Sequence, residues 1–230
     1  MFTETAAYYD LLYFTCKDYA REATQLCAEL LRLHPDCRTV LDVACGTGEH
    51  ARRLGDRGFD VDGLDLNADF VRLARGKHPR GNFIVADMTD FHLDRRYDAV
   101  VCLFSSIAYA GTLARVESAF RCFREHLAPG GVVLVEPWFP PGFLEHGRRS
   151  TDDATSGDVR IIRRCRVEVT DRMSRLHFDY EIAERGVTRH ATEIHELGLF
   201  TADEMLDAFE RAGLRATFRP EGFAGQREGN

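Results

Sequence analysis

The run Asp42-x-Ala44-x-Gly46-x-Gly48 has the spacing of a strand that ends in a tight turn and leads into a helix. Apolar, β-prone residues precede it, and a helix-compatible segment follows from Glu49. Glycines leave no side chain between backbone and ligand, and the start of a helix presents unpaired backbone N–H groups. The run therefore predicts a turn that binds a small molecule, with an acidic side chain beside it.

Two classes of cofactor bind at such a turn. A dinucleotide site needs a third glycine so that the pyrophosphate can sit on the helix N-terminus. This chain has His50-Ala51 in that place. The Asp42 carboxylate would repel a phosphate, and it suits a cofactor with an amino-acid end and a sulfonium charge. The turn favours S-adenosylmethionine, although a structural glycine pair in an α/β fold stays the alternative.

Two further acidic positions follow predicted strands. Asp65 closes the second strand, where a carboxylate can accept both hydroxyls of a ribose. A helix N-cap would also place an aspartate there. Asp87-Met88 follows the third strand and suits an adenine ring, with the carboxylate near the exocyclic amine and Met88 against the ring face. Acidic loop residues are common, so Asp87 alone leaves both interpretations open.

Composition narrows the class of protein. A chain of 230 residues with 44% hydrophobic residues is expected to form one large α/β domain, or one domain with a small insertion. The net charge of −7 disfavours a nucleic-acid partner. The 7 cysteines form no CxxC pair and do not cluster with histidine, so we expect reduced thiols and no metal site. No signal peptide or membrane span is evident, which predicts a cytoplasmic protein.

Alternating strand and helix patterns over residues 39–136 predict a Rossmann-like, mostly parallel sheet with helices on both faces. An interrupted helical segment over residues 5–33, broken at 14–18, precedes this sheet. The expected strands are 39–44, 59–64, 82–86, 97–103 and 132–136, and the helices between them are 49–57, 67–74 and 112–127.

The pattern changes after residue 158. Period-two alternation without intervening helices predicts antiparallel strands at 159–169, 173–183 and 188–197, which would cover the active site at the carboxyl edge of the parallel sheet. A capped helix at 201–212 and a sixth core strand at 214–218 would follow. The expected organisation is a helical lid at 1–36, a cofactor-binding core at 37–140, an antiparallel insertion at 141–198 and a closing segment at 199–230.

The order and spacing of these elements resemble the class I S-adenosylmethionine-dependent methyltransferases over residues 37–136. The flanks are similar to the dTDP-amino-sugar N,N-dimethyltransferases of antibiotic deoxysugar pathways, which methylate a sugar amine carried on thymidine diphosphate. The blocks that carry this similarity are Tyr9-Asp10-Leu11, Lys17-Asp18-Tyr19, Asp87-Met88-x-Asp90-Phe91, Phe104-Ser105-Ser106-Ile107, Val135-Glu136-Pro137-Trp138 and Leu199-Phe200.

The resemblance implies an S-adenosyl-L-methionine-dependent N-methyltransferase, a small-molecule amine as substrate and a homodimer. Tyr109 takes the place of a histidine or tyrosine that faces the amine, and Trp138 and Phe139 would shape the sugar pocket. Together with the glycine turn, the expected cofactor-binding residues are Tyr9, Tyr19, Asp42, Ala44, Gly46, Gly48, Asp65, Asp87, Met88 and Leu103.

A basic cluster lies in the first predicted antiparallel strand. Arg160, Arg164 and Arg166 would share one face of this strand, with Arg163 opposite. Because guanidinium groups match a diphosphate well, Arg164 and Arg166 are predicted to bind substrate. A solvated edge strand protected by charge is the alternative.

His177, Tyr180 and His195 lie on neighbouring predicted strands, where we expect them to be structural. In the predicted reaction Tyr109 orients the amine or accepts a proton, and Glu136 is a weaker candidate for that role.

Three alternatives stay open. They are a small-molecule O-methyltransferase, an N-methyltransferase of a non-sugar amine, and a non-catalytic nucleotide-binding protein. The chain also departs from the family pattern at both ends. Phe2 is the nearest match to an expected aromatic substrate contact, and residues 225–230 carry no apolar strand of the kind that closes the family's sheet.

Overall fold

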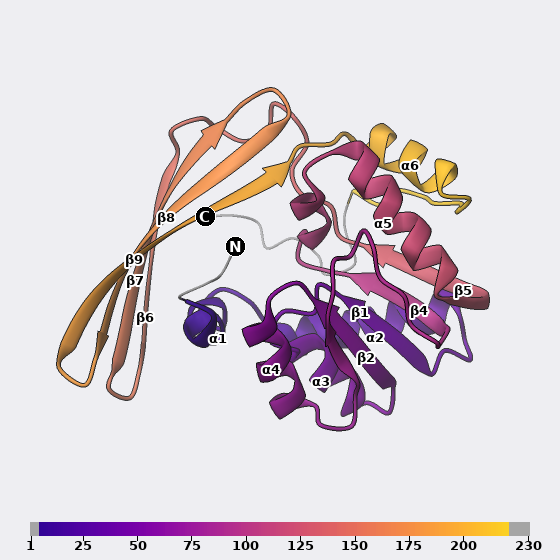
Figure 1. Ribbon diagram of the computed structural model, residues 1–230, viewed down its shortest axis with the longest axis horizontal. Helices are drawn as coiled ribbons and strands as arrows, with labels where there is room; N and C mark the ends of the chain where they lie inside the picture. The colour runs from indigo at the N-terminus through magenta and orange to yellow at the C-terminus, as the bar shows by residue number, and fades with distance from the viewer. Residues whose placement is uncertain (1–4, 221–230) are drawn as a thin grey trace.

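A five-stranded parallel sheet forms the centre of the computed structural model, which describes residues 5–220 (Figure 1). Its strands follow the order β3-β2-β1-β4-β5. They are β1 (Thr39–Val43), β2 (Asp60–Asp65), β3 (Phe83–Val85), β4 (Tyr97–Cys102) and β5 (Leu127–Val135). The chain direction across the sheet reverses between β1 and β4, and ligands bind in open α/β sheets at the carboxyl ends of strands beside such a switch.

Helices cover both faces of this sheet because successive strand residues point to opposite sides. Val40 packs in one cluster with Leu26 and Leu54, under the helices α2 (Tyr19–Leu33), α3 (Glu49–Gly55) and α4 (Ala68–Lys77). Leu41 packs in the other cluster with Phe120, under α5 (Leu113–Glu125) and α6 (Ala202–Arg211). The predicted parallel sheet with helices on both faces is confirmed.

An antiparallel sheet of four strands stands beside the parallel sheet (Figure 1), which confirms the three predicted antiparallel strands and adds a fourth. Its strands lie in chain order as β6 (Arg149–Ser156), β7 (Val159–Val169), β8 (Met173–Glu184) and β9 (Val187–Gly198). The short helices η1 (Ala6–Tyr8) and α1 (Tyr9–Tyr13) precede α2, and Leu12 packs on the inner face of this sheet beside Ile161 and Phe178. The helix η2 (Ser106–Ala110) follows β4 and contacts β9. Segments far apart in the chain therefore meet between the two sheets.

Most helix and strand boundaries lie within a few residues of those predicted from the sequence. The predicted break in the first helical segment is confirmed, since α1 ends at Tyr13 and α2 begins at Tyr19 with Asp18 accepting from the Arg21 N–H at 3.0 Å. The expected capping box of α6 is also present, between Thr201 and Glu204.

Three expectations are corrected. Strand β6 was missed because its sequence is polar and only Ala154 is buried, so pairing with β7 rather than an apolar pattern defines it. Strand β5 begins at Leu127 instead of residue 132, with a register irregularity opposite Tyr97 and Ala99.

The sixth core strand predicted at 214–218 is wrong, because these residues form no strand. Gly213 takes a φ of 79°, its N–H bonds the Glu210 carbonyl, and the Leu214 N–H bonds the Phe209 carbonyl. This pattern terminates α6 and turns Leu214 back onto the α5–α6 cluster. The expectations for Phe2 and for residues 225–230 lie outside the described residues.

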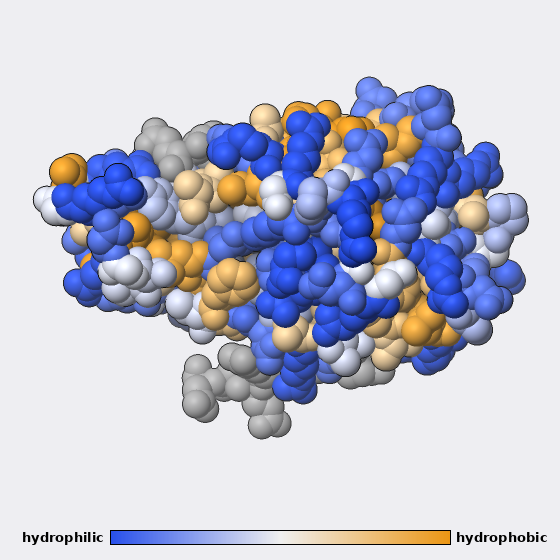
Figure 2. All heavy atoms as spheres, turned by 90° about the horizontal axis from the view of Figure 1, so that it is seen from below, coloured by the Kyte–Doolittle hydropathy of each residue, from blue (hydrophilic) through white to orange (hydrophobic). Residues whose placement is uncertain are grey.

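Figure 2 shows one face of the molecule, on which hydrophilic side chains dominate and separate the apolar areas. Within residues 5–220, no helix combines the length and apolarity that a membrane span requires.

Candidate active site

Two connected cavities open at the carboxyl ends of β1, β2 and β4. The smaller cavity surrounds the turn after β1, and the larger one, of ≈ 650 Å³, extends to the inner face of the antiparallel sheet. Both are lined by Tyr9, Ala44, Gly46, Phe104 and Ser106. They are therefore two parts of one site.

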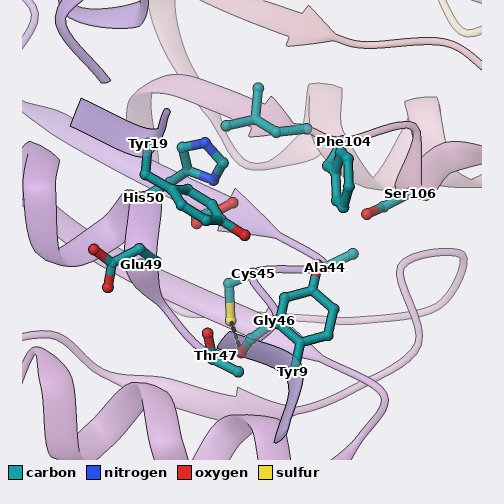
Figure 3. A pocket seen from close by; sticks show the side chains of 12 residues that line it. Tyr9, Tyr19, Ala44, Cys45, Gly46, Thr47, Glu49, His50, Phe104 and Ser106 are labelled. Carbon is teal, nitrogen blue, oxygen red and sulfur yellow. Dashed lines mark hydrogen bonds between the residues drawn. The ribbon is translucent and has the colours of Figure 1, made fainter. Parts of the chain in front are cut away.

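The turn after β1 adopts left-handed backbone conformations at alternate residues. Ala44 has φ 58° and Gly46 has φ 55°. A Cβ added to Gly46 would meet no atom within 4 Å, which leaves its backbone open toward the cavity (Figure 3). Gly48 has φ 75° and does not line either cavity; a Cβ there would lie 2.8 Å from the Ala74 Cα. Gly48 thus allows α3 and α4 to pack closely and supports the turn indirectly.

Asp42 is buried at the base of the smaller cavity. Its side chain lies at 2% exposure, and its Oδ2 has no hydrogen-bond partner among the described residues. Burial, followed by the nearby Asp65 carboxylate, raises the pKa of Asp42 to about 8. A buried carboxylate without a donor is costly, and a cationic ligand would offset that cost. This orphaned oxygen fits the sulfonium and ammonium groups of S-adenosylmethionine.

Asp65 is oriented by two backbone N–H groups. Gly46 donates to Oδ2 at 2.9 Å, and Asn67 donates to Oδ1 at 2.8 Å. Asn67 in turn caps α4. The side chain lines the larger cavity, where its carboxylate oxygens can accept hydrogen bonds from a diol.

Asp87 and Met88 line the same cavity. Asp87 accepts from the Thr89 backbone N–H and hydroxyl, and its Oδ2 pairs with Arg115 at 2.8 Å. Burial opposes ionisation of Asp87, but the hydrogen bonds from Thr89 and Arg115 outweigh it and lower its pKa. Arg115 also lines the cavity. Its position on α5 gave no signal in the sequence.

Tyr9 and Tyr19 close the smaller cavity from the N-terminal helices (Figure 3). Burial raises the pKa of both phenols, so both stay protonated and can donate hydrogen bonds. The Tyr19 ring lies edge-on to His50 in the first turn of α3, with centroids 5.1 Å apart. Leu103 lines the same cavity after β4.

Tyr109 and Trp138 line the larger cavity where the antiparallel sheet borders it. The Tyr109 hydroxyl is 2.7 Å from Nδ1 of His195 on β9. The Trp138 indole donates to Ser174 Oγ on β8 at 3.0 Å, which fixes its ring between the two sheets. Phe139 is not among the residues that line the cavity; its ring contacts Trp138, with centroids 4.7 Å apart.

The structure does not bring Arg164 or Arg166 to the cavity. Both are exposed on the outer face of β7, and Arg164 lies 3.5 Å from Glu181. Arg163 lines the cavity instead, buried and bonded to Asp152 and to the Tyr13 hydroxyl, each at 2.9 Å. The sequence did predict that Arg163 would lie on the face of the strand opposite Arg164 and Arg166. Arg163 alternates in step with the apolar residues of β7, and this pattern was the signal that it lies on the inner face.

Comparison with known proteins gives one family match and several relatives of nearly full length. A model described as a methyltransferase domain matches residues 40–131. The chain is 38% identical to the dTDP-3-amino-3,6-dideoxy-alpha-D-glucopyranose N,N-dimethyltransferase of Streptomyces fradiae. That alignment covers 97% of this chain and 88% of the relative.

Solved structures at higher than 25% identity share the fold, and two of them illustrate the match. DesVI of Streptomyces venezuelae superposes with a TM-score of 0.90 at 35% identity, covering 98% of this chain and 96% of DesVI. CalS10 of Micromonospora echinaspora, an amino pentose methyltransferase solved with S-adenosylmethionine bound, gives a TM-score of 0.80 at 30% identity. That match covers 93% of this chain and 89% of CalS10.

Proposed function

We propose that this chain, which belongs to the dTDP-amino-sugar N,N-dimethyltransferases, methylates the amine of a dTDP-linked amino-deoxysugar with S-adenosylmethionine as methyl donor. The observation that carries this proposal is the continuous site between the two sheets. Acidic groups suited to an adenosyl cofactor line it at the parallel sheet, and Tyr109 and Trp138 line it where they bond to the antiparallel sheet.

The cofactor would occupy the end of the site formed by the parallel sheet. Asp42 would lie near its positive charges, and Asp65 would accept the ribose hydroxyls. Asp87 and Met88 would contact the adenine ring. Tyr9 and Tyr19 would close over the methionine end as hydrogen-bond donors.

The amino sugar would occupy the end formed by the antiparallel sheet. Trp138 would bound the sugar pocket from its fixed position against Ser174. Phe139 would support the Trp138 ring from outside the cavity. The outward positions of Arg164 and Arg166 remove the support for a diphosphate contact from these two residues.

The chemistry requires alignment more than acid–base power. When bound, S-adenosylmethionine supplies a sulfonium methyl that the substrate amine can displace in line. The protein has to exclude water, bring the amine to the methyl group and keep the nitrogen lone pair available. Tyr109, which lines the cavity, would contact the amine.

A substrate panel tests the proposal. Purified protein, S-adenosylmethionine and dTDP-amino sugars with the amine at C3 or C4 would be compared with simple amines, amino acids and phenols, with products identified by mass spectrometry. Mono- or dimethylated nucleotide sugar supports the proposal. Methylation confined to non-nucleotide amines or to hydroxyl groups would refute the substrate class and leave a methyltransferase of another kind.

Two further features come from the family relationship. We propose a homodimer, which sedimentation velocity would test, and a cytoplasmic location, which fractionation of producing cells would test. A monomer across micromolar concentrations would rule out the first. Recovery with the membrane or culture medium would rule out the second.

A further inference from the structure

Three polar side chains form a line at the substrate end of the site. The Tyr109 hydroxyl lies 2.7 Å from His195 Nδ1, and His195 Nε2 lies 3.4 Å from Glu193 Oε2. Glu193 and His195 are two residues apart on β9, so both point inward, and both are buried. Tyr109 and His195 line the larger cavity.

Burial and hydrogen-bond partners together indicate which ring nitrogen of His195 carries the proton. Burial lowers the pKa of His195, so its imidazole is neutral near pH 7 and carries one N–H. Both oxygens of the Glu193 carboxyl group accept from the Thr5 hydroxyl, at 2.9 and 3.0 Å, and with Glu193 as the acceptor the His195 N–H lies on Nε2. Nδ1 is then an acceptor, and the Tyr109 O–H must donate to it.

This direction matters for the amine. A phenol whose proton is held by His195 offers only oxygen lone pairs to the cavity, so the amine donates an N–H to it. The nitrogen lone pair then stays available for attack. A Tyr109 hydroxyl without that acceptor would donate to the amine and occupy the lone pair that must form the new bond.

We propose that His195, with Glu193 fixing its tautomer, is a positioning residue that holds the Tyr109 hydroxyl as a hydrogen-bond acceptor for the substrate amine. The inference deepens the proposed function and rests on it. In the step itself the amine nitrogen forms the new C–N bond, the methyl–sulfur bond breaks, and the sulfur keeps the electron pair. The positive charge passes to the amine nitrogen, whose N–H groups still face the Tyr109 oxygen.

Polar, charged and aromatic groups from several elements surround the His195 ring. Tyr109 faces it from η2 and Glu193 from β9, and Arg163 on β7 disfavours its positive charge. The Phe178 ring on β8 lies edge-on at 5.0 Å. Protonation of His195 would reverse its hydrogen bond with Tyr109, because both ring nitrogens would then donate.

Four variants test the inference with a dTDP-amino sugar that the wild-type protein methylates. His195→Leu should lower kcat about tenfold, the effect of losing one hydrogen bond of moderate strength. His195→Leu should lower kcat more than Tyr109→Phe does. The reason is that His195→Leu keeps the Tyr109 hydroxyl, which can then donate to the amine. His195→Gln, whose amide oxygen can accept from Tyr109, should recover most of the rate. In the Tyr109→Phe background, His195→Leu should have no further effect.

The pH profile of kcat gives an independent readout. The wild-type protein should lose activity at low pH with a midpoint below 6.5, and His195→Gln should lack that step. The inference would be overturned if kcat were unchanged in both His195 variants. It would also be overturned if His195→Leu lowered kcat equally with Tyr109 and with Phe at position 109. Melting temperature and S-adenosylmethionine binding verify that each variant is folded. Failure of the wild-type protein to methylate any amino sugar would instead refute the proposed function.

Discussion

The Thr47 hydroxyl in the turn after β1 donates a 2.6 Å hydrogen bond to Asp10 Oδ1 on α1. Lys77 on α4 reinforces this link, with Nζ 2.6 Å from Asp10 Oδ2 and 2.8 Å from Thr47 Oγ1. One carboxylate thus joins the segment that carries Tyr9 to the turn that forms the floor of the smaller cavity. The N-terminal helices are therefore held closed by a side chain that is part-buried beside the cofactor end of the site.

Asp10→Ala should weaken S-adenosylmethionine binding mainly through faster dissociation. The variant removes the acceptor shared by Thr47 and Lys77, so the closed position of α1 is less stable. A loss of about 1–2 kcal/mol corresponds to roughly a 5- to 30-fold higher Kd. Stopped-flow fluorescence with the cofactor would measure both rate constants.

Asp153→Ala is the matched control for the Asp10 variant. It also removes an arginine-paired carboxylate, but this pair with Arg160 is exposed on the β6–β7 hairpin. It should leave both rate constants unchanged. Equal dissociation rates for wild type and Asp10→Ala would show that this contact does not restrain the helices.

Asp42→Asn should weaken cofactor binding and stabilise the protein without cofactor at high pH. The folded-state pKa of about 8 lies above the ordinary aspartate value, so the folded protein holds a proton there that the unfolded chain has lost. The contribution of Asp42 to stability is therefore present at low pH and is lost as pH rises through about 8. Asparagine carries no charge to bury and removes that dependence.

Melting temperatures from pH 5 to 9 would check the sign of this effect. The difference between Asp42→Asn and wild type should grow with pH, while calorimetry should show at least roughly tenfold weaker cofactor binding. Asp42→Asn should therefore raise the melting temperature while lowering the affinity for the cofactor. A residue with a purely structural role would not give these two opposite effects. A variant that is less stable than wild type at pH 9, or one that binds the cofactor normally, would contradict the assignment of Asp42.

The sequence located the cofactor end of the site better than the substrate end. Asp42, Asp65 and Asp87 lie at or just after the carboxyl ends of three consecutive strands, and the fold brings the carboxyl ends of parallel strands together. A local pattern therefore predicts their proximity. The turn itself is also local, since its left-handed positions fall on Ala44 and glycines.

The substrate end depends on contacts across the chain that local patterns do not encode. His195 was expected to be structural, and its partner Tyr109 lies 86 positions earlier on a different element. The side chain of Arg163 was placed on the correct side of its strand, but which side faces the cavity depends on how the antiparallel sheet docks. Strand β6 was missed for a related reason, because its pairing with β7 rather than its composition makes it a strand.

Gly48→Ala and Gly46→Ala should separate stability from binding. At Gly48 the new Cβ would lie 2.8 Å from the Ala74 Cα, and the φ of 75° is unfavourable for alanine. Close packing and backbone strain together predict a loss of about 2–5 kcal/mol. At Gly46 there is space, so the loss should be limited to about 1–2 kcal/mol of backbone strain.

Cofactor affinity should fall more in Gly46→Ala than in Gly48→Ala, the reverse of the order expected for stability. The Cβ at residue 46 would project into open space beside the cofactor end of the site, whereas residue 48 does not line it. Affinity measured at a temperature where both variants are folded should fall more for Gly46→Ala. Equal melting temperatures for the two variants would contradict the packing argument for α3 and α4.

Arg164→Ala should leave KM for the nucleotide sugar unchanged and alter the free energy of unfolding by no more than about 0.5 kcal/mol. Its side chain is exposed on the outer face of β7, away from the cavity. Arg163→Met, one position earlier, removes a buried cation bonded to Asp152 and Tyr13 and should cost about 1–3 kcal/mol. Chemical denaturation and steady-state kinetics on the two variants would compare adjacent arginines on opposite faces of one strand. A raised KM for Arg164→Ala with normal stability would mean that the substrate reaches the outer face and would restore the diphosphate contact predicted from the sequence.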